Sequence, residues 1–128
     1  PNNFTALAMT GQSYMNEHKW DDAIAALSKA EAVQPENVAV IASIGNSYMY
    51  KAQEAVELAT QGGKRLTPEV EAQILDIYKQ AISYLEKAKN LDTTMQFKSV
   101  WAYSLYTCCY RALGPDDAKT KEAEALTK

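Results

Sequence analysis

The stretches that decide the fold are PNNFTALAMTGQSYMNE (1–17) and PENVAVIASIGNSYMYK (35–51), which repeat in register at a spacing of 34 residues. Seven of the seventeen aligned positions are identical, among them the pair Gly11/Gly45. A fixed period of this length is typical of stacked repeats, in which one unit cannot bury its own apolar face. The period therefore predicts a repeat protein, a class that binds partners more often than it performs chemistry.

The composition of the 128-residue chain favours an all-α fold. Runs of β-branched residues are absent, and only Pro68 and Pro115 follow Pro35, so few positions interrupt a helix. The length suits one domain, which buries about two-thirds of its unfolded surface. The net charge of −3 argues against a nucleic-acid or anionic-membrane partner, because both require a basic face. No apolar run approaches the roughly 20 residues that span a bilayer, so membrane insertion by this segment is not expected.

The first repeat unit has a distinctive pattern of small and large residues, namely Leu7, Gly11, Tyr14, Ala23, Leu27, Ala30 and Pro35. This spacing resembles the tetratricopeptide repeat (TPR), a helix-turn-helix of 34 residues. Gly11 allows two helices to approach closely, and Pro35 ends the second helix because it lacks an amide donor. The resemblance implies an all-α, right-handed superhelix of antiparallel helix pairs, with about six helices in this chain.

The expected helices cover about 3–17, 20–33, 37–61, 67–91, 94–113 and 115–126. Asp21 and Asp22 are expected in the first turn of the second helix, where carboxylates suit the positive end of the helix dipole. The same holds for Asp116 and Asp117 in the last helix. The fourth helix is expected to begin with Thr67 as its N-cap and proline at its first position.

The second repeat is longer than the first by 24 residues, inserted between Tyr48 and Ala81. Apolar stripes with the i, i+3, i+4, i+7 spacing run along both sides of the insertion, and they consist of Ala52, Ala55, Val56 and Ala59, then Val70, Ile74, Ile77 and Ala81. The stripes predict two long antiparallel helices over 38–61 and 67–91, with Gly62-Gly63 at an exposed tip. Bacterial TPR proteins with a lengthened middle hairpin are similar over nearly the whole chain.

The domain is expected to contain repeat one (about 4–37), an extended repeat two (about 38–95), and an irregular repeat three with a capping helix (about 96–128). Three tyrosines compete for one position in repeat three, so its register stays open. Pro1-Asn2-Asn3 matches the start of the second unit, which suggests a segment of a longer protein. Its compartment, cytoplasmic or periplasmic, stays open. The surface of helix one that would meet an earlier repeat is expected to be unusually apolar or covered by a neighbouring molecule, so Leu7, Met9 and Thr10 are not all expected to be buried.

Few residues favour chemistry. His18 is the single histidine, and we expect it to hydrogen-bond the last carbonyl groups of helix one rather than bind a metal. Cys108 and Cys109 are neighbours on a helix, about 100° apart around its axis, so they cannot both face one metal. The Gly62-Gly63 turn lacks the spacing of a phosphate-binding loop. We therefore expect a non-enzyme without catalytic residues, metal or cofactor.

The TPR resemblance implies a concave groove lined by the first helix of each repeat. The residues assigned to it are Ala8, Gln12, Met15, Asn16, Ala42, Asn46, Met49 and Tyr50. Amides supply hydrogen bonds for a peptide backbone, and methionines supply adaptable apolar contact. An equally weighted alternative is that the insertion packs over this face and buries it. The groove lacks the cations with which chaperone-binding TPR modules hold a terminal carboxylate, so that subtype is not expected.

Two functions follow as expectations. The first is a non-enzymatic scaffold that binds a peptide or partner protein through the concave groove. The second is a structural or self-assembling module that packs through its extended hairpin and missing upstream repeats, which includes a homo-oligomer.

Overall fold

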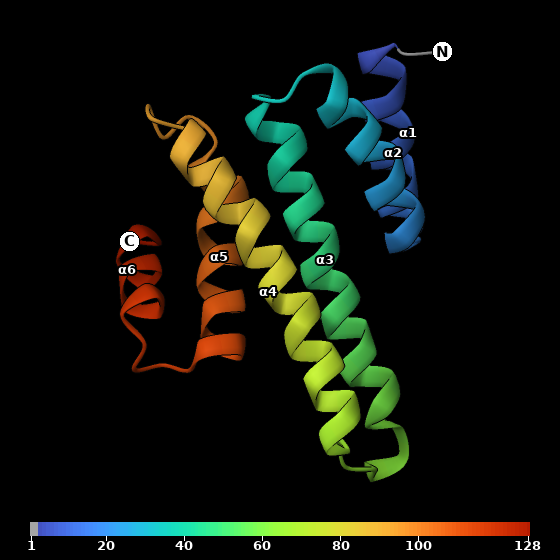
Figure 1. Ribbon diagram of the computed structural model, residues 1–128, viewed down its shortest axis with the longest axis vertical. Coiled ribbons are helices and arrows are strands. Elements are labelled where there is room, and N and C mark those ends of the chain that lie inside the picture. Colours follow the sequence, from blue (N-terminus) through green and yellow to red (C-terminus); the bar gives the residue numbers. More distant parts are fainter. Residues whose placement is uncertain (1–2) are drawn as a thin grey trace.

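The computed structural model describes residues 3–128, which form six α-helices and one short 3₁₀-helix (Figure 1). The elements are α1 (Phe4–Asn16), α2 (Trp20–Val33), α3 (Val38–Ala59), η1 (Gln61–Gly63), α4 (Pro68–Leu91), α5 (Lys98–Leu113) and α6 (Ala118–Leu126). These residues contain no strand, so the predicted all-α fold is confirmed. Pro1 and Asn2, which the repeat alignment pairs with Pro35 and Glu36, lie outside the described residues.

The helices form three pairs, α1/α2, α3/α4 and α5/α6, that stand side by side (Figure 1). The longest pair lies in the middle, with α1/α2 against one side and α5/α6 against the other. The first helices of successive pairs are neighbours, because α3 contacts both α1 and α5. This packing agrees with the predicted stack of helix pairs, whereas the right-handed superhelix stays a prediction.

The repeated glycines allow the close helix contacts that the sequence predicts. A Cβ placed on Gly11 would lie 2.5 Å from Cγ of Leu27, and one on Gly45 would lie 2.7 Å from Cγ of Leu85. Real Cβ atoms do not come this close to another carbon, so any larger residue would push α1 from α2 or α3 from α4. The same type of glycine–leucine contact therefore joins the two helices within the first pair and the two helices within the second pair.

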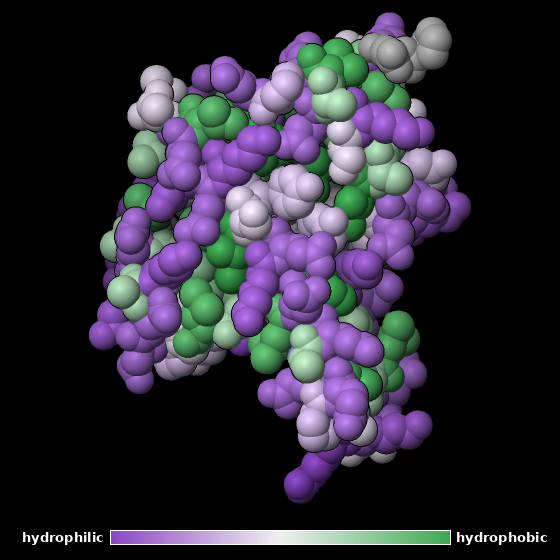
Figure 2. All heavy atoms as spheres, viewed as in Figure 1, coloured by the Kyte–Doolittle hydropathy of each residue, from purple (hydrophilic) through white to green (hydrophobic). Residues whose placement is uncertain are grey.

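The long hairpin is confirmed, since α3 and α4 run antiparallel and are joined by a short exposed turn. Gly62 and Gly63 have φ angles of 71° and 80°, which glycine adopts without the clash that a Cβ would cause. Thr67 caps α4, because its Oγ1 accepts a hydrogen bond from the Val70 amide at 3.2 Å. The tip of the hairpin projects beyond the other four helices (Figure 1). On the face shown in Figure 2, hydrophilic side chains cover this end.

The fifth helix begins at Lys98, four residues later than the predicted Thr94. Asp92 is the cause, because its Oδ2 accepts hydrogen bonds from the Phe97 amide and from Nε1 of Trp101, both at 2.8 Å. Asp92 and Trp101 are both buried. The carboxylate holds the connection in a non-helical path until Phe97, so the predicted start was wrong.

The sixth helix also begins later than predicted, at Ala118 instead of Pro115. Asp117 is its N-cap, and its Oδ1 accepts a hydrogen bond from the Lys119 amide at 2.9 Å. Gly114 has a φ angle of 91°, and the chain turns before the helix starts. The placement of Asp116 and Asp117 in the first turn was therefore wrong, since a side chain that caps the amides competes with helix continuation.

Two groups of buried side chains form the core. The smaller group lies between α1/α2 and the start of α3, and the larger lies between α3/α4 and α5/α6. Tyr48 and Tyr84 stack with ring centroids 5.7 Å apart and pack against both groups, so the core is continuous across the three pairs. None of the helices within residues 3–128 combines the length and apolar character needed to cross a membrane.

Candidate functional site

A cleft of about 650 Å³ opens where the turn between α1 and α2 meets the middle of α3. It is lined by Gln12, Met15 and Asn16 from α1, His18 and Trp20 from the turn and the start of α2, and Tyr50, Gln53, Glu54 and Glu57 from α3. We call it the α1–α3 cleft. Its lining residues come from both sides of the contact between the first helix pair and the long hairpin.

The turn between α1 and α2 sets one wall of the cleft. The amides of His18 and Lys19 donate to the carbonyls of Met15 and Tyr14 at 3.0 and 2.9 Å, which closes the end of α1. His18 has a φ angle of 61°, a left-handed conformation that is uncommon outside glycine. This tight turn places Trp20 at the first position of α2, beside α3.

Three aromatic rings stack across the cleft. The centroids of His18 and Trp20 lie 5.2 Å apart with a 16° angle between ring planes. Trp20 and Tyr50 follow at 5.1 Å and 26°, so the stack joins the turn to α3. Nε1 of Trp20 is buried and has no hydrogen-bond partner within residues 3–128. The stack gives the cleft a flat apolar wall whose outer member, Tyr50, is 41% exposed.

The polar side chains of the cleft are amides and carboxylates. Nε2 of Gln12 donates to Oδ1 of Asn16 at 3.4 Å, and both residues are exposed. Neither Glu54 nor Glu57 forms an ion pair in the described part of the chain. The lining residues include two glutamates and no lysine or arginine, and the adjoining Lys19 and Lys51 each lie within 4.0 Å of another carboxylate.

The eight residues assigned to the groove lie in three different places in the structure. Gln12, Met15, Asn16 and Tyr50 come together in the α1–α3 cleft. Ala8 is half-buried and packs against the smaller core group. The other three, Ala42, Asn46 and Met49, lie on the half of α3 that α5 covers.

The packing of α5 explains this division. Ala42 and Met49 are buried in the larger core group, and Nδ2 of Asn46 donates to the Val100 carbonyl of α5 at 3.1 Å. These three residues therefore hold two helices together instead of facing an open groove. The single continuous surface expected from the TPR positions is not formed, because α5 rather than the hairpin closes its second half.

Five lining residues were not assigned to the groove from the sequence, namely His18, Trp20, Gln53, Glu54 and Glu57. Gln53, Glu54 and Glu57 follow Tyr50 at i+3, i+4 and i+7, which is the spacing of one helix face. That polar stripe was the signal that could have identified them. It was missed because these residues lie in the insertion, where the TPR pattern has no equivalent positions.

The residues considered for chemistry lie in settings that do not activate them. Burial raises the pKa of the Cys108 thiol to about 12, and the pKa of Cys109 rises to about 11 through burial and the nearby Glu86 charge. A thiol reacts as its thiolate, so both cysteines stay unreactive near neutral pH. His18 stacks on Trp20. Residues 3–128 contain no group of three or more His, Cys, Asp or Glu side chains placed to hold a metal ion.

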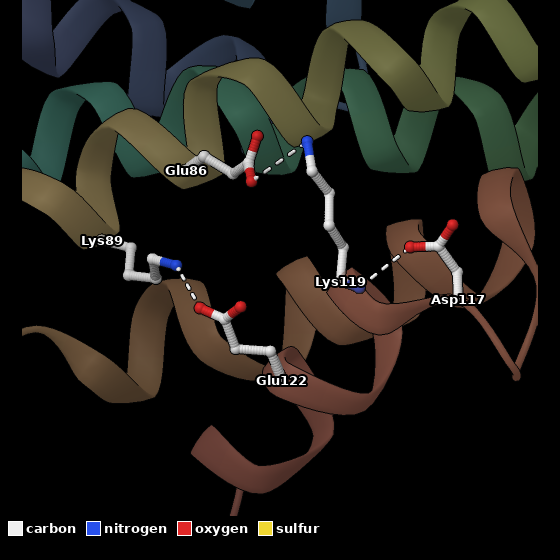
Figure 3. A network of polar contacts seen from close by, with 5 residues as sticks. All are labelled: Glu86, Lys89, Asp117, Lys119 and Glu122. Carbon is white, nitrogen blue, oxygen red and sulfur yellow. Dashed lines mark hydrogen bonds and ion pairs between the residues drawn. The ribbon is translucent and has the colours of Figure 1, made fainter.

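A second cavity, of about 780 Å³, lies over α4 between the end of α2 and the start of α6. Part of the charge around it is already paired (Figure 3): Lys119 lies 3.7 Å from Glu86, and next to the cavity Lys89 lies 3.2 Å from Glu122. Lys87, which also lines this cavity, pairs with Glu31 at 2.6 Å. The α1–α3 cleft contains a stack of three aromatic rings and four of the residues assigned to the groove, so we place the candidate site there.

No protein-family model matches the chain, and no curated protein matches it either. The resemblance to TPR proteins therefore rests on the residue pattern.

Proposed function

We propose that this protein is a non-enzymatic interaction module of the TPR type, which binds a peptide segment of a partner protein in the α1–α3 cleft. The observation that carries the proposal is one cleft that combines a stack of three aromatic rings, exposed amides, and two carboxylates that form no ion pair within residues 3–128. Tyrosine and tryptophan are the residues that contribute most to binding at protein interfaces. The matched contacts Gly11/Leu27 and Gly45/Leu85 support the TPR assignment.

The chemistry of the cleft suits a peptide. Gln12, Asn16 and Gln53 offer both donors and acceptors, which a peptide backbone needs along its length. Met15 is half-buried at the cleft wall and can adapt its shape to an apolar side chain. The four lining residues of α3 are all exposed, so an extended chain can reach them without unfolding the protein.

The test is a selection of displayed random peptides on the wild-type protein, followed by affinity measurements on variants. Tyr50→Ala is expected to weaken the selected peptides by about 1–3 kcal/mol, because it removes the outer member of the aromatic stack. Tyr110→Ala is the matched control, since Tyr110 is 47% exposed on α5 and Tyr50 is 41% exposed. Circular dichroism checks that both variants keep their helices.

The proposal fails if the selected peptides bind Tyr50→Ala as tightly as the wild type. It also fails if Tyr110→Ala weakens them as much as Tyr50→Ala does, because the binding surface would then lie on α5.

A second candidate function is self-assembly, favoured by large apolar side chains that are exposed outside the cleft. Leu58 on the hairpin is 58% exposed and Met9 on α1 is 67% exposed. Self-assembly predicts a concentration-dependent increase in mass by sedimentation velocity, which Leu58→Asn or Met9→Asn should abolish. A monomer at all concentrations would exclude this function for the chain as it stands.

A further inference from the structure

We propose that the α1–α3 cleft selects a peptide that presents an arginine side chain, an inference that rests on the proposed peptide-binding function. A guanidinium group is flat, cationic and rich in N–H donors. The cleft offers a partner for each of these properties.

The first argument is charge complementarity. Glu54 and Glu57 line the cleft at i and i+3 on α3, without an ion pair inside residues 3–128. Like charges at this spacing repel one another on a helix. The nearby Lys51 cannot relieve this repulsion, because its Nζ lies 2.7 Å from the Asp21 carboxylate. A cation delivered by a ligand would be attracted by both glutamates.

The second argument is the aromatic wall. One face of Tyr50 lies against Trp20, and the tyrosine remains 41% exposed. A guanidinium stacks on an aromatic face through dispersion and through the attraction between the cation and the ring electrons. An acidic or neutral side chain lacks the second of these terms. The exposed part of Tyr50 therefore favours a flat cation.

The third argument is spacing. Tyr50 and Glu54 are four residues apart, so they lie on successive turns of α3, about 5–6 Å apart along the axis. A guanidinium over the Tyr50 ring can direct its N–H groups along its own plane to the Glu54 carboxylate. The lysine ammonium is a compact charge without that plane, so it cannot stack flat on Tyr50 while it presents two parallel N–H donors to Glu54. The arrangement therefore favours arginine over lysine.

The experiment uses short Gly/Ala peptides that differ only in one central residue, which is arginine, lysine, citrulline or glutamate. Citrulline keeps the shape of arginine without its charge. Binding is measured by NMR titration of the ¹⁵N-labelled protein, with the Trp20 indole signal as the local readout. We expect the arginine peptide to bind about tenfold more tightly than the citrulline peptide, a preference that raised salt weakens.

Variants identify the partners of the arginine. The double variant Glu54→Gln/Glu57→Gln is expected to lose about tenfold in affinity for the arginine peptide and to lose its preference over citrulline. Glu69→Gln/Glu71→Gln makes the same change in net charge on α4, outside the cleft, and should bind as the wild type does. Equal binding of the arginine and lysine peptides would overturn the choice of arginine.

The selected peptides from the display experiment separate two kinds of failure. If they depend on Tyr50 but contain no arginine and ignore Glu54→Gln/Glu57→Gln, the cleft binds peptides and the arginine inference is wrong. If neither they nor the arginine peptide depend on Tyr50, the peptide-binding function itself is wrong. Arg65 is exposed in the hairpin turn between η1 and α4, so a second copy of the chain could supply the arginine. A dimer that Arg65→Gln dissociates, with the cleft signals returning to those of the monomer, would make a second copy the occupant and overturn the peptide ligand.

Discussion

Gln12 and Met15 on α1 occupy the same repeat positions as Asn46 and Met49 on α3, yet the two pairs have opposite surroundings. Gln12 is exposed and Met15 is half-buried, and both line the α1–α3 cleft. Asn46 is bonded to the Val100 carbonyl, and Met49 is 6% exposed. Equivalent residues in a repeat therefore become binding or structural according to the helix that packs against them. Here the junction of α1 with α3 is open, whereas the junction of α3 with α5 is closed.

The largest effect on stability is expected from a substitution of Asp92, which fixes the start of α5 at the closed junction. Asp92→Ala removes two short hydrogen bonds and leaves Nε1 of the fully buried Trp101 without an acceptor. We expect a loss of about 3 kcal/mol in the free energy of unfolding, measured by urea denaturation. Met49 should also become accessible, which would make the closed junction resemble the open one.

The control for this change is Asp76→Ala, because Asp76 is an exposed acid that accepts a hydrogen bond from Gln80 on its own helix. Its effect should stay within about 0.5 kcal/mol. Equal stability of Asp92→Ala and the wild type would show that the junction is held by packing alone.

Alanine at the repeated glycines is expected to have the next largest effect. Gly45→Ala should destabilise the protein by about 2 kcal/mol, because Leu85 lies within the larger core group and cannot move away. Gly11→Ala should cost less, since Leu27 belongs to the smaller group. Thermal unfolding of both variants beside Ser13→Ala, an exposed position on α1, would measure the difference. Stabilisation of either glycine variant would contradict the close contacts.

Removing the two equivalent amides tests the comparison directly. Asn46→Ala should cost about 1 kcal/mol of stability, since it removes the hydrogen bond to the Val100 carbonyl at 3.1 Å. Gln12→Ala should change stability by less than about 0.5 kcal/mol, because its contact is on the surface. Only the Gln12 variant should affect the selected peptides. A reversed order of the two stabilities would break the distinction between open and closed junctions.

The smallest effect on stability near neutral pH concerns the thiols. Cys108 and Cys109 should resist alkylation in the folded protein, whereas a cysteine introduced as Met15→Cys in the cleft should react readily. Folding raises the two pKa values from 9.0 to about 12 and about 11, so the thiols favour the folded state below pH 9.0. This contribution is lost as the pH rises through the folded values.

Rates of alkylation by iodoacetamide, with and without urea, check the thiol prediction. Rapid modification of Cys108 in the absence of urea would show that the closed junction opens.

The helices and the long hairpin could be predicted because their signals are local. The second helix was predicted at 20–33 and occurs at Trp20–Val33, and the hairpin turn was marked by Gly62-Gly63. The start of α5 could not be predicted, since it depends on Asp92 reaching Trp101 across the connection. That hydrogen bond is tertiary and leaves no periodic pattern in the sequence.

Four of the eight residues assigned to the groove line the α1–α3 cleft, and the repeat pattern explains why only these four do. The TPR positions identify which residues face the neighbouring first helix, but they do not state how closely that helix approaches. Asn46 was expected in an open groove but is partly buried and bonded to α5, and Met49 was expected there too but is buried in the larger core group. Glu54 and Glu57 lie beyond the repeat unit, so only the structure brings them beside Trp20.

The projecting hairpin has a consequence for local unfolding. Residues 53–73, which form the projecting end of the hairpin, contain no fully buried side chain. Ala42 and Ala52, which lie nearer the body on α3, are completely buried. Amide hydrogens should therefore exchange fastest near the tip and progressively more slowly toward the body. Glu54 and Glu57 lie near the body of the protein, just beyond the buried Ala52, and a bound ligand would slow amide exchange most at these residues. Peptide binding would thus also stiffen the base of the hairpin.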